Sequence, residues 1–112
     1  MTVFRIYEEF KSKIESCGIK AVEVEYAKDA PVPNLVYFRS ADNSIYADSV
    51  PIIVKTAIAV ELYTGKTDNK SERLFEHWLR ENEIKYQKTE RVWLTTEKWY
   101  QTVYEFELIF DE

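Results

Sequence analysis

The stretch WYQTVYEFELIF, residues 99–110, decides the fold because it alternates apolar and polar side chains over most of its length. Such alternation is typical of a β-strand with one buried face, since successive side chains of a strand point to opposite faces of a sheet. Residues 86–94 alternate in the same way, and the polar residues 95–98 lie between the two runs. We therefore expect a hairpin, whose second strand has a buried face formed by Tyr100, Thr102, Tyr104, Phe106, Leu108 and Phe110.

Three more strands are expected upstream of this hairpin. The longest runs from Ile52 to Tyr63 and places on one face Val54, Thr56, Ile58, Val60 and Leu62. Residues 35–39, LVYFR, form a short aromatic and β-branched run, and residues 21–26, AVEVEY, alternate as a half-exposed strand does. Residues 29–34 contain two prolines and are expected to form a loop.

Two segments have helical periodicity. From Thr2 to Cys17 the spacing of apolar residues is four and three, which predicts an amphipathic helix that Thr2 starts and Gly18 ends. A second helix is expected to begin at Asp68 or Asn69, with a buried stripe formed by Leu74, Phe75, Trp78 and Leu79.

The predicted elements follow the order α-β-β-β-α-β-β. Because no helix alternates regularly with single strands, a parallel α/β sheet is not expected. The sequence predicts one α+β domain over residues 1–112, with a mostly antiparallel mixed β-sheet of about five strands and two helices packed on one face.

Composition excludes several classes of protein. The chain has 112 residues with a formal charge of -5, which disfavours a general binder of nucleic acid or anionic membranes. Its single Cys17 cannot form an internal disulfide and fits a reducing cytoplasm, and one Cys with one His is too few for a zinc site. No signal-peptide core or membrane-spanning run is recognised.

Gly65-Lys66-Thr67 lies between a predicted strand and a predicted helix, where a phosphate-binding loop would end. The pattern also needs a glycine at position 60, so that the backbone can curl around phosphates, and this position holds Val60. An ordinary glycine turn with a solvated lysine is the preferred interpretation, and nucleotide binding is kept as an alternative.

Other reactive side chains point to no site. Asp42, Asn43, Ser44 and Asp48 lack the glycine and glutamate spacing of a calcium loop and are expected to act in turns. His77 has no marked nucleophile, Cys17 is expected in the core, and the pair Glu8-Glu9 is expected on a solvated helix face. No catalytic residue, cofactor or metal is predicted.

Residues 40–51 contain many turn formers and are expected to form a long loop, yet the loop and the start of the next strand carry several apolar side chains. Loops normally expose polar groups, so burial by a partner would explain these residues. The predicted interface consists of Ile45, Tyr46, Asp48, Val50, Pro51, Ile52 and Ile53, with the exposed side of the first helix as a second candidate surface.

The chain resembles the tail terminator, tail-completion and head-tail joining proteins of long-tailed bacteriophages and their prophages. The resemblance spans residues 33–108 in order and spacing. It rests on Pro33, Leu35-Val36-Tyr37, Ala47-Asp48, Glu61-Leu62-Tyr63-Thr64, Lys66, Asp68, Glu72, Glu76, Leu79, Ile84, Tyr86, Lys88, Glu90, Glu97, Trp99-Tyr100-Gln101 and Val103-Tyr104-Glu105-Phe106. The chain departs from the family pattern after Asp48, where Ser49 replaces the usual asparagine and Pro51-Ile52 follow.

This resemblance implies a structural virion protein rather than an enzyme. It implies a homo-oligomeric, hexameric ring that caps the head-proximal end of the tail tube, stops tube polymerisation and joins the tail to the head. Its partners would be other copies of itself, the tail tube protein and the head-completion (connector) protein, with DNA only in transit through the lumen and no membrane. The protein would be assembled in the cytoplasm of a bacterial host. A small nucleotide-binding or enzymatic domain, or a regulatory interaction domain, is the alternative.

Overall fold

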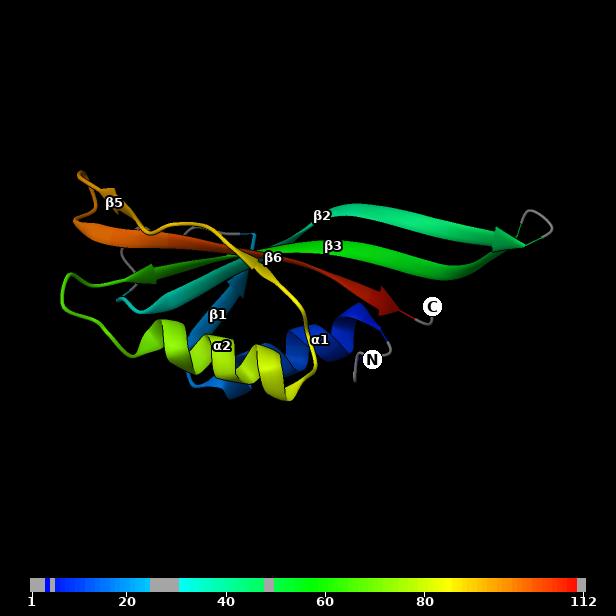
Figure 1. Cartoon of the computed structure of the whole chain (residues 1–112), viewed down its shortest axis with the longest axis horizontal. Coiled ribbons are helices and arrows are strands. Elements are labelled where there is room, and N and C mark those ends of the chain that lie inside the picture. The colour runs from blue at the N-terminus through cyan, green and yellow to red at the C-terminus, as the bar shows by residue number, and fades with distance from the viewer. Residues whose placement is uncertain (1–3, 5, 25–30, 48–49, 111–112) are drawn as a thin grey trace.

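A mixed β-sheet of six strands carries two helices on one of its faces (Figure 1). The computed structural model describes residues 4, 6–24, 31–47 and 50–110, and for residues 43–47 and 50–54 it describes the backbone alone. The elements are α1 (Tyr7–Lys13), the 3-10 helix η1 (Ile14–Cys17), β1 (Lys20–Glu23), β2 (Asn34–Ala47), β3 (Val50–Thr64), α2 (Ser71–Glu81), β4 (Gln87–Lys88), β5 (Val92–Leu94) and β6 (Trp99–Phe110). The predicted α+β class is confirmed.

The sheet has the order β1-β2-β3-β6-β4, and β5 pairs with the start of β6. Only β1 and β2 are parallel, and every other described pairing is antiparallel. The predicted strand over residues 86–94 is divided into β4 and β5. It breaks at Thr89, whose hydroxyl accepts the amide of Val103 and so replaces a backbone carbonyl in the ladder.

The predicted buried faces of the two central strands are confirmed for most of their residues, but Tyr100 is half-buried and the side chain of Val54 is not described. Thr56, Ile58, Val60 and Leu62 of β3 are all buried, as are the alternate residues of β6 from Thr102 to Phe110. They face the helices, where the ring of Phe10 from α1 packs edge-on against both Tyr37 of β2 and Phe106 of β6. The hydrophobic core therefore lies between the sheet and the helical layer.

The first helix is shorter than expected. Its α-helical part begins at Tyr7, and the last turn, Ile14–Cys17, is 3-10. Gly18 ends it in the left-handed region, with φ of 101°, as predicted. Thr2, the predicted cap, lies outside the described residues.

The second helix begins at Ser71, and Asp68 organises its start. The Asp68 carboxylate accepts the amides of Lys70 and Ser71 and the hydroxyl of Ser71. Its buried stripe is formed by Ser71, Phe75, Trp78 and Leu79. Leu74, which was expected in this stripe, is 46% exposed because Ser71 occupies the core-facing position one turn before Phe75.

The predicted long loop over residues 40–51 is wrong. Here β2 and β3 form one long antiparallel hairpin, with Asp42 opposite Thr56 and Ala47 opposite Val50. The polar side chains of this stretch bind the partner strand instead of forming turns: Thr56 Oγ1 donates to Asp42 Oδ1 at 2.8 Å, and Ser40 Oγ donates to the carbonyl of Ala57 at 3.1 Å.

Figure 1 shows this hairpin extending well past the end of both helices, so the molecule is elongated, with extents of 52 × 26 × 23 Å. None of the described helices is long and apolar enough to cross a lipid bilayer.

Candidate functional site

The predicted interface residues lie at the far end of the β2–β3 hairpin. In the backbone register Ile45 is opposite Ile53, and Tyr46 is opposite Pro51. Val50 and Ile52 belong to the same end of β3. Asp48 lies outside the described residues, and the side chains of the others are likewise not described.

Few described strands cover this end of the hairpin. On the outer side of β2, β1 pairs only with Asn34–Tyr37, and on the other side of β3, β6 ends at Phe110 opposite Val54. Pro51 lies opposite Tyr46 of β2, and on the other side of β3 no described strand pairs with this residue, so a proline is tolerated there. Within the described chain, the outer part of the hairpin is therefore a two-stranded ribbon whose edges are available for pairing.

The exposed side of the first helix, the second predicted surface, carries an ion-pair cluster. Lys11 Nζ lies 2.9 Å from Glu23 Oε1 of β1, and the hydroxyl of Tyr7 donates to Glu23 Oε2 at 2.7 Å. Hydrogen bonds from Tyr7 and Lys11 lower the pKa of Glu23 below its usual value. The guanidinium of Arg39 lies 4.7 Å from the Tyr7 ring centre. This cluster fastens α1 to the edge of the sheet.

The Gly65 turn lacks the geometry of a phosphate loop. The amide of Asp68 binds the carbonyl of Gly65 at 3.2 Å, which closes a tight turn. The amides of Lys70 and Ser71 at the start of α2 already bind the Asp68 carboxylate. Burial alone would raise the pKa of Asp68, but these hydrogen bonds keep it below its usual value, so a negative carboxylate occupies the place that a phosphate would need.

The remaining reactive side chains have ordinary partners. His77 is exposed on α2, with Nε2 2.8 Å from Glu81 Oε1 of the same helix. Cys17 is buried as expected, and burial raises the pKa of its thiol, so the group is held as a neutral core side chain. The described residues contain no group of three or more His, Cys, Asp or Glu side chains placed to hold a metal ion.

A partly buried polar cluster, which we call the Glu76 clamp, joins α2 to β4 and β6. Glu76 Oε2 accepts the hydroxyl of Tyr104 at 2.7 Å and lies 2.7 Å from Lys88 Nζ. The hydroxyl of Tyr86 donates to Oε1 at 3.3 Å, and Lys88 also lies 2.6 Å from Glu72 Oε1. The clamp therefore fixes the chain after α2 against the helix.

The clamp shifts the pKa values of its members. Burial alone would raise the pKa of Glu76, yet the hydrogen bonds from Lys88 and Tyr104 hold it below its usual value. Burial, and then the hydrogen bond to Glu76, raise the pKa of Tyr104. The ionised carboxylate of Glu76 binds the charged Lys88 and the neutral phenols of Tyr86 and Tyr104, and Glu72 is a second partner of Lys88. The five groups satisfy one another, which makes the clamp a structural device.

The sequence analysis did not predict the contacts of this clamp, although its residues are among those on which the family resemblance rests. Glu72, Glu76, Tyr86, Lys88 and Tyr104 all belong to the matched set. The one usable signal was the spacing of Glu72 and Glu76, which are four residues apart on a single face of the predicted helix. Their basic and phenolic partners come from other elements, so only the fold brings them together.

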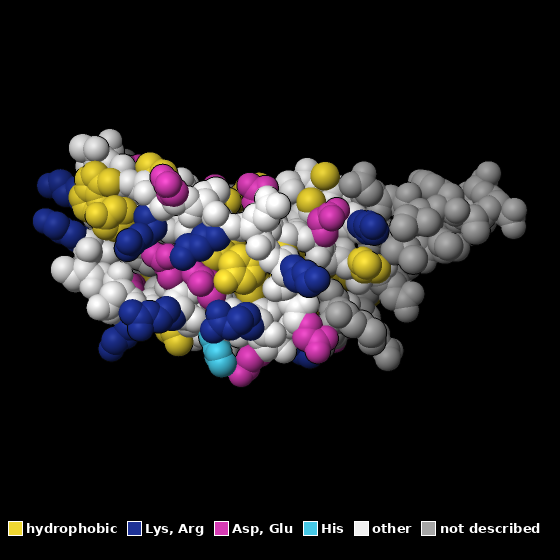
Figure 2. Space-filling model, viewed as in Figure 1, with side chains coloured by type: hydrophobic (Ala, Val, Ile, Leu, Met, Phe, Trp, Pro, Cys, Tyr) yellow, Lys and Arg dark blue, Asp and Glu magenta, His cyan; other side chains and the backbone are white. Residues whose placement is uncertain are grey.

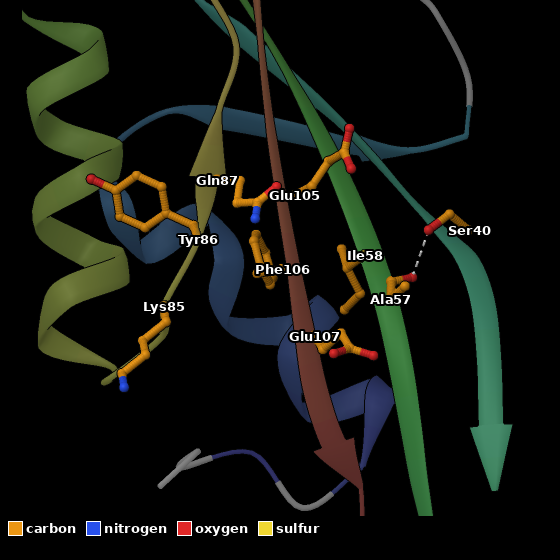
Figure 3. Close-up of a pocket in the computed structure, with 9 residues that line it drawn as sticks. All are labelled: Ser40, Ala57, Ile58, Lys85, Tyr86, Gln87, Glu105, Phe106 and Glu107. Atoms are coloured by element: carbon orange, nitrogen blue, oxygen red, sulfur yellow. Dashed lines mark hydrogen bonds between the residues drawn. The ribbon is translucent and has the colours of Figure 1, made fainter.

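A groove of about 480 Å³ is lined by residues of β2, β3 and β6 and by the segment from Lys85 to Gln87 (Figure 3). The groove begins next to Gln87, the first residue of β4, which pairs with Glu105 of β6. Figure 3 shows the carboxylates of Glu105 and Glu107 on the same side of β6 as Ser40 and Ala57, while Lys85 and Tyr86 lie on the other side. Glu105 and Glu107 are both exposed, and no ion pair among the described residues includes either of them. We call this feature the sheet groove.

The hairpin of β5 and β6 ends in an exposed aromatic patch. Trp93 is 39% exposed and Val92 is 52% exposed. The Trp93 ring packs edge-on against Tyr100, with ring centres 4.9 Å apart, and the guanidinium of Arg91 lies 5.6 Å from the Tyr100 ring centre. Figure 2 shows an apolar patch with Lys and Arg side chains on either side at the end of the molecule that carries β5. We call Arg91, Val92, Trp93, Lys98 and Tyr100 the aromatic tip.

Comparison with known proteins adds no relative. No protein-family model matches the chain, and a search of curated proteins finds no match.

Proposed function

We propose that this protein is a structural virion assembly protein of the tail-terminator or tail-completion type. It forms a ring on the head-proximal end of a phage tail tube, stops tube polymerisation and joins the tail to the head. The proposal combines the resemblance over residues 33–108 with the shape of the molecule. Assembly takes place in the bacterial cytoplasm, and the product resides at the head-tail interface of the virion.

The observation that carries the proposal is the β2–β3 hairpin, which extends past the helical layer with few described strand neighbours (Figure 1). A long strand edge is a template for pairing with another chain, and monomeric proteins usually cover or shorten such edges. An assembly protein has a use for an uncovered one, because a neighbouring subunit supplies the cover. The predicted interface residues Ile45, Tyr46 and Ile53 belong to this part of the hairpin.

A closed ring needs two different complementary surfaces on each subunit, since a head-to-tail contact closes only by repetition around an axis. The hairpin end is one candidate surface, and the sheet groove and the aromatic tip are two others. The negative net charge of the chain suits a ring through which DNA passes without binding, because like charges repel.

The test is a capping experiment with purified tail tube protein from the same gene cluster. Added protein is expected to stop tube growth at substoichiometric amounts and to appear as a ring at one tube end in electron micrographs. Tubes that grow to the same length with and without it would contradict the proposal. Matched addition of a variant with Ile45, Tyr46 and Val50 changed to Ser is the control for the hairpin.

A separate experiment tests the alternative that the chain binds a nucleotide. The melting temperature is measured with and without ATP and magnesium, where a ligand at a hundredfold excess over its Kd would stabilise the fold by about 2.7 kcal/mol. We expect no shift, because the Asp68 carboxylate already binds the first amides of α2. A shift that the Lys66→Ala variant abolishes would revive the enzymatic interpretation.

A further inference from the structure

We propose that the sheet groove of one subunit receives the aromatic tip of the next copy of this chain. This inference rests on the proposed function, since it names the contact between copies in the ring. The two surfaces are different parts of the molecule, so the contact is head-to-tail and leaves one tip and one groove free on every dimer for further addition.

Charge complementarity supports this pairing. On one side of β6 the groove presents the carboxylates of Glu105 and Glu107, neither of which is in an ion pair among the described residues. The basic lining residue Lys85 lies on the other side of β6 (Figure 3). The tip carries Arg91 and Lys98, both exposed. Opposite charges on two separate faces of one chain attract successive copies and disfavour contacts between like faces.

Shape supports it as well. The groove has small residues, Ser40 and Ala57, on the side where the two carboxylates lie (Figure 3), which leaves room for a large side chain. The tip is a hairpin end that presents an exposed indole. An aromatic side chain that fills a pocket on the partner is a common form of interface hot spot.

The tip is also held in one arrangement before binding. The Trp93 ring is fixed edge-on against Tyr100, and Arg91 lies over Tyr100 while its Nε is 3.4 Å from Glu72 of α2. Ordering these side chains therefore costs little on association. Because Trp93 and Tyr100 pack edge-on, their ring faces are less accessible for base stacking than those of an aromatic platform. The chain is also acidic overall, and both features favour a protein partner for the tip over nucleic acid.

Two variants test the contact. Trp93→Ala removes the centre of the tip and leaves the groove intact. Glu105→Lys/Glu107→Lys reverses the charge of the groove and leaves the tip intact. Each is compared with the wild type by sedimentation velocity across a concentration series, after circular dichroism shows that it is folded. Each variant alone is expected to associate at least tenfold more weakly than the wild type.

The decisive sample is an equimolar mixture of the two variants. The groove of one and the tip of the other are still functional, so the mixture is expected to form a 1:1 dimer that grows no further, because the remaining tip and groove are both disabled. Controls are Leu74→Ala, an exposed apolar residue on α2, and Glu81→Lys/Glu83→Lys, which changes the net charge equally at two exposed positions at and just after the end of α2. Both controls are expected to associate as the wild type does.

Several outcomes would overturn the contact. Variants that associate as the wild type does would place the ring contact elsewhere and leave the proposed function standing. A mixture that stays monomeric would show that these two surfaces do not meet. Binding of a fluorescent single-stranded oligonucleotide that Trp93→Ala abolishes would assign the tip to nucleic acid. The tail-tube capping experiment decides the proposed function independently of these results.

Discussion

Trp78 on α2 donates a hydrogen bond from Nε1 to Oγ of Ser16 in η1, at 2.8 Å, across 62 positions of the chain. The same indole stacks on Phe75 and contacts the rings of Phe4 and Phe10. One side chain thus binds the two helices to each other as well as to the core. The helical layer is therefore a single unit beneath the sheet.

Replacing Trp78 with Ala should lower the free energy of unfolding by about 3–5 kcal/mol, because a large buried side chain leaves a cavity. Ser16→Ala removes the hydroxyl that accepts from the indole and donates to the carbonyl of Lys13, and it should cost about 1 kcal/mol. Urea denaturation followed by fluorescence or circular dichroism measures both. A loss below 1 kcal/mol for Trp78→Ala would mean that α2 is not packed as described.

The Glu76 clamp should make stability depend on pH. The pKa of Glu76 is lower in the folded protein than in the unfolded chain, so its contribution is fully present above the unfolded value, about 4.3, and is lost as pH falls through the folded value. We expect Glu76→Gln to cost about 1–3 kcal/mol at pH 7 and to cost less at pH 3. Urea unfolding at both pH values is the measurement.

Glu90→Gln is the matched control for the clamp, because Glu90 is exposed. It should leave stability nearly unchanged at both pH values. An equal loss from Glu76→Gln at pH 7 and at pH 3 would contradict the assignment of an ionised carboxylate to the clamp.

Substitution of the two glycines of the chain should affect stability to different extents. Gly18 has φ of 101°, a backbone conformation that strains any side chain, so Gly18→Ala should cost about 1–2 kcal/mol. A Cβ at Gly65 would meet only Cγ2 of Val32, at an ordinary 3.6 Å, so Gly65→Ala should be nearly neutral. Thermal melts of the two variants give the comparison directly. Equal losses of stability for the two variants would show that the turn at Gly65 requires glycine for a reason other than its described geometry.

The end of the β2–β3 hairpin should matter more for assembly than for folding. Ile45 and Val50 lie beyond Phe110, the last described residue of β6, so their backbone has little of the sheet around it. Changing Ile45, Tyr46 and Val50 to Ser should leave the unfolding midpoint nearly unchanged and should abolish tail-tube capping. A destabilised monomer that still caps tubes would place these residues in an ordinary core.

The sequence was most informative where one face of a strand is buried. The bounds of β6, Trp99–Phe110, and the buried face of β3 were predicted correctly because alternation has only one structural meaning over so many residues. The hairpin end was misjudged because Asp42 and Ser40 are turn formers by local preference, and their strand conformation depends on partners on β3. Local propensity yields to cross-strand pairing in such a case.

The candidate surfaces divide in a similar way. The predicted interface near Ile45 remains a prediction, since its side chains lie outside the described ones. The aromatic tip lies around the hairpin turn that the sequence predicted. The sheet groove combines residues from separate elements, such as Ser40 with Glu107, and no spacing within the sequence links such residues. Discovery of the groove required the register of the sheet.

The sheet order has a consequence for how the chain folds. The two central strands, β3 and β6, are neighbours in space but are separated in sequence by α2, β4 and β5. The β2–β3 hairpin is local and closes quickly, whereas pairing of Thr64 with Tyr100 must first close the long intervening segment. We therefore expect a refolding chain to hold β2 and β3 together before β6 arrives, with the apolar face of β3 open to solvent. During that interval nascent chains are most prone to mispair, and slow synthesis or low temperature should raise the yield of native protein.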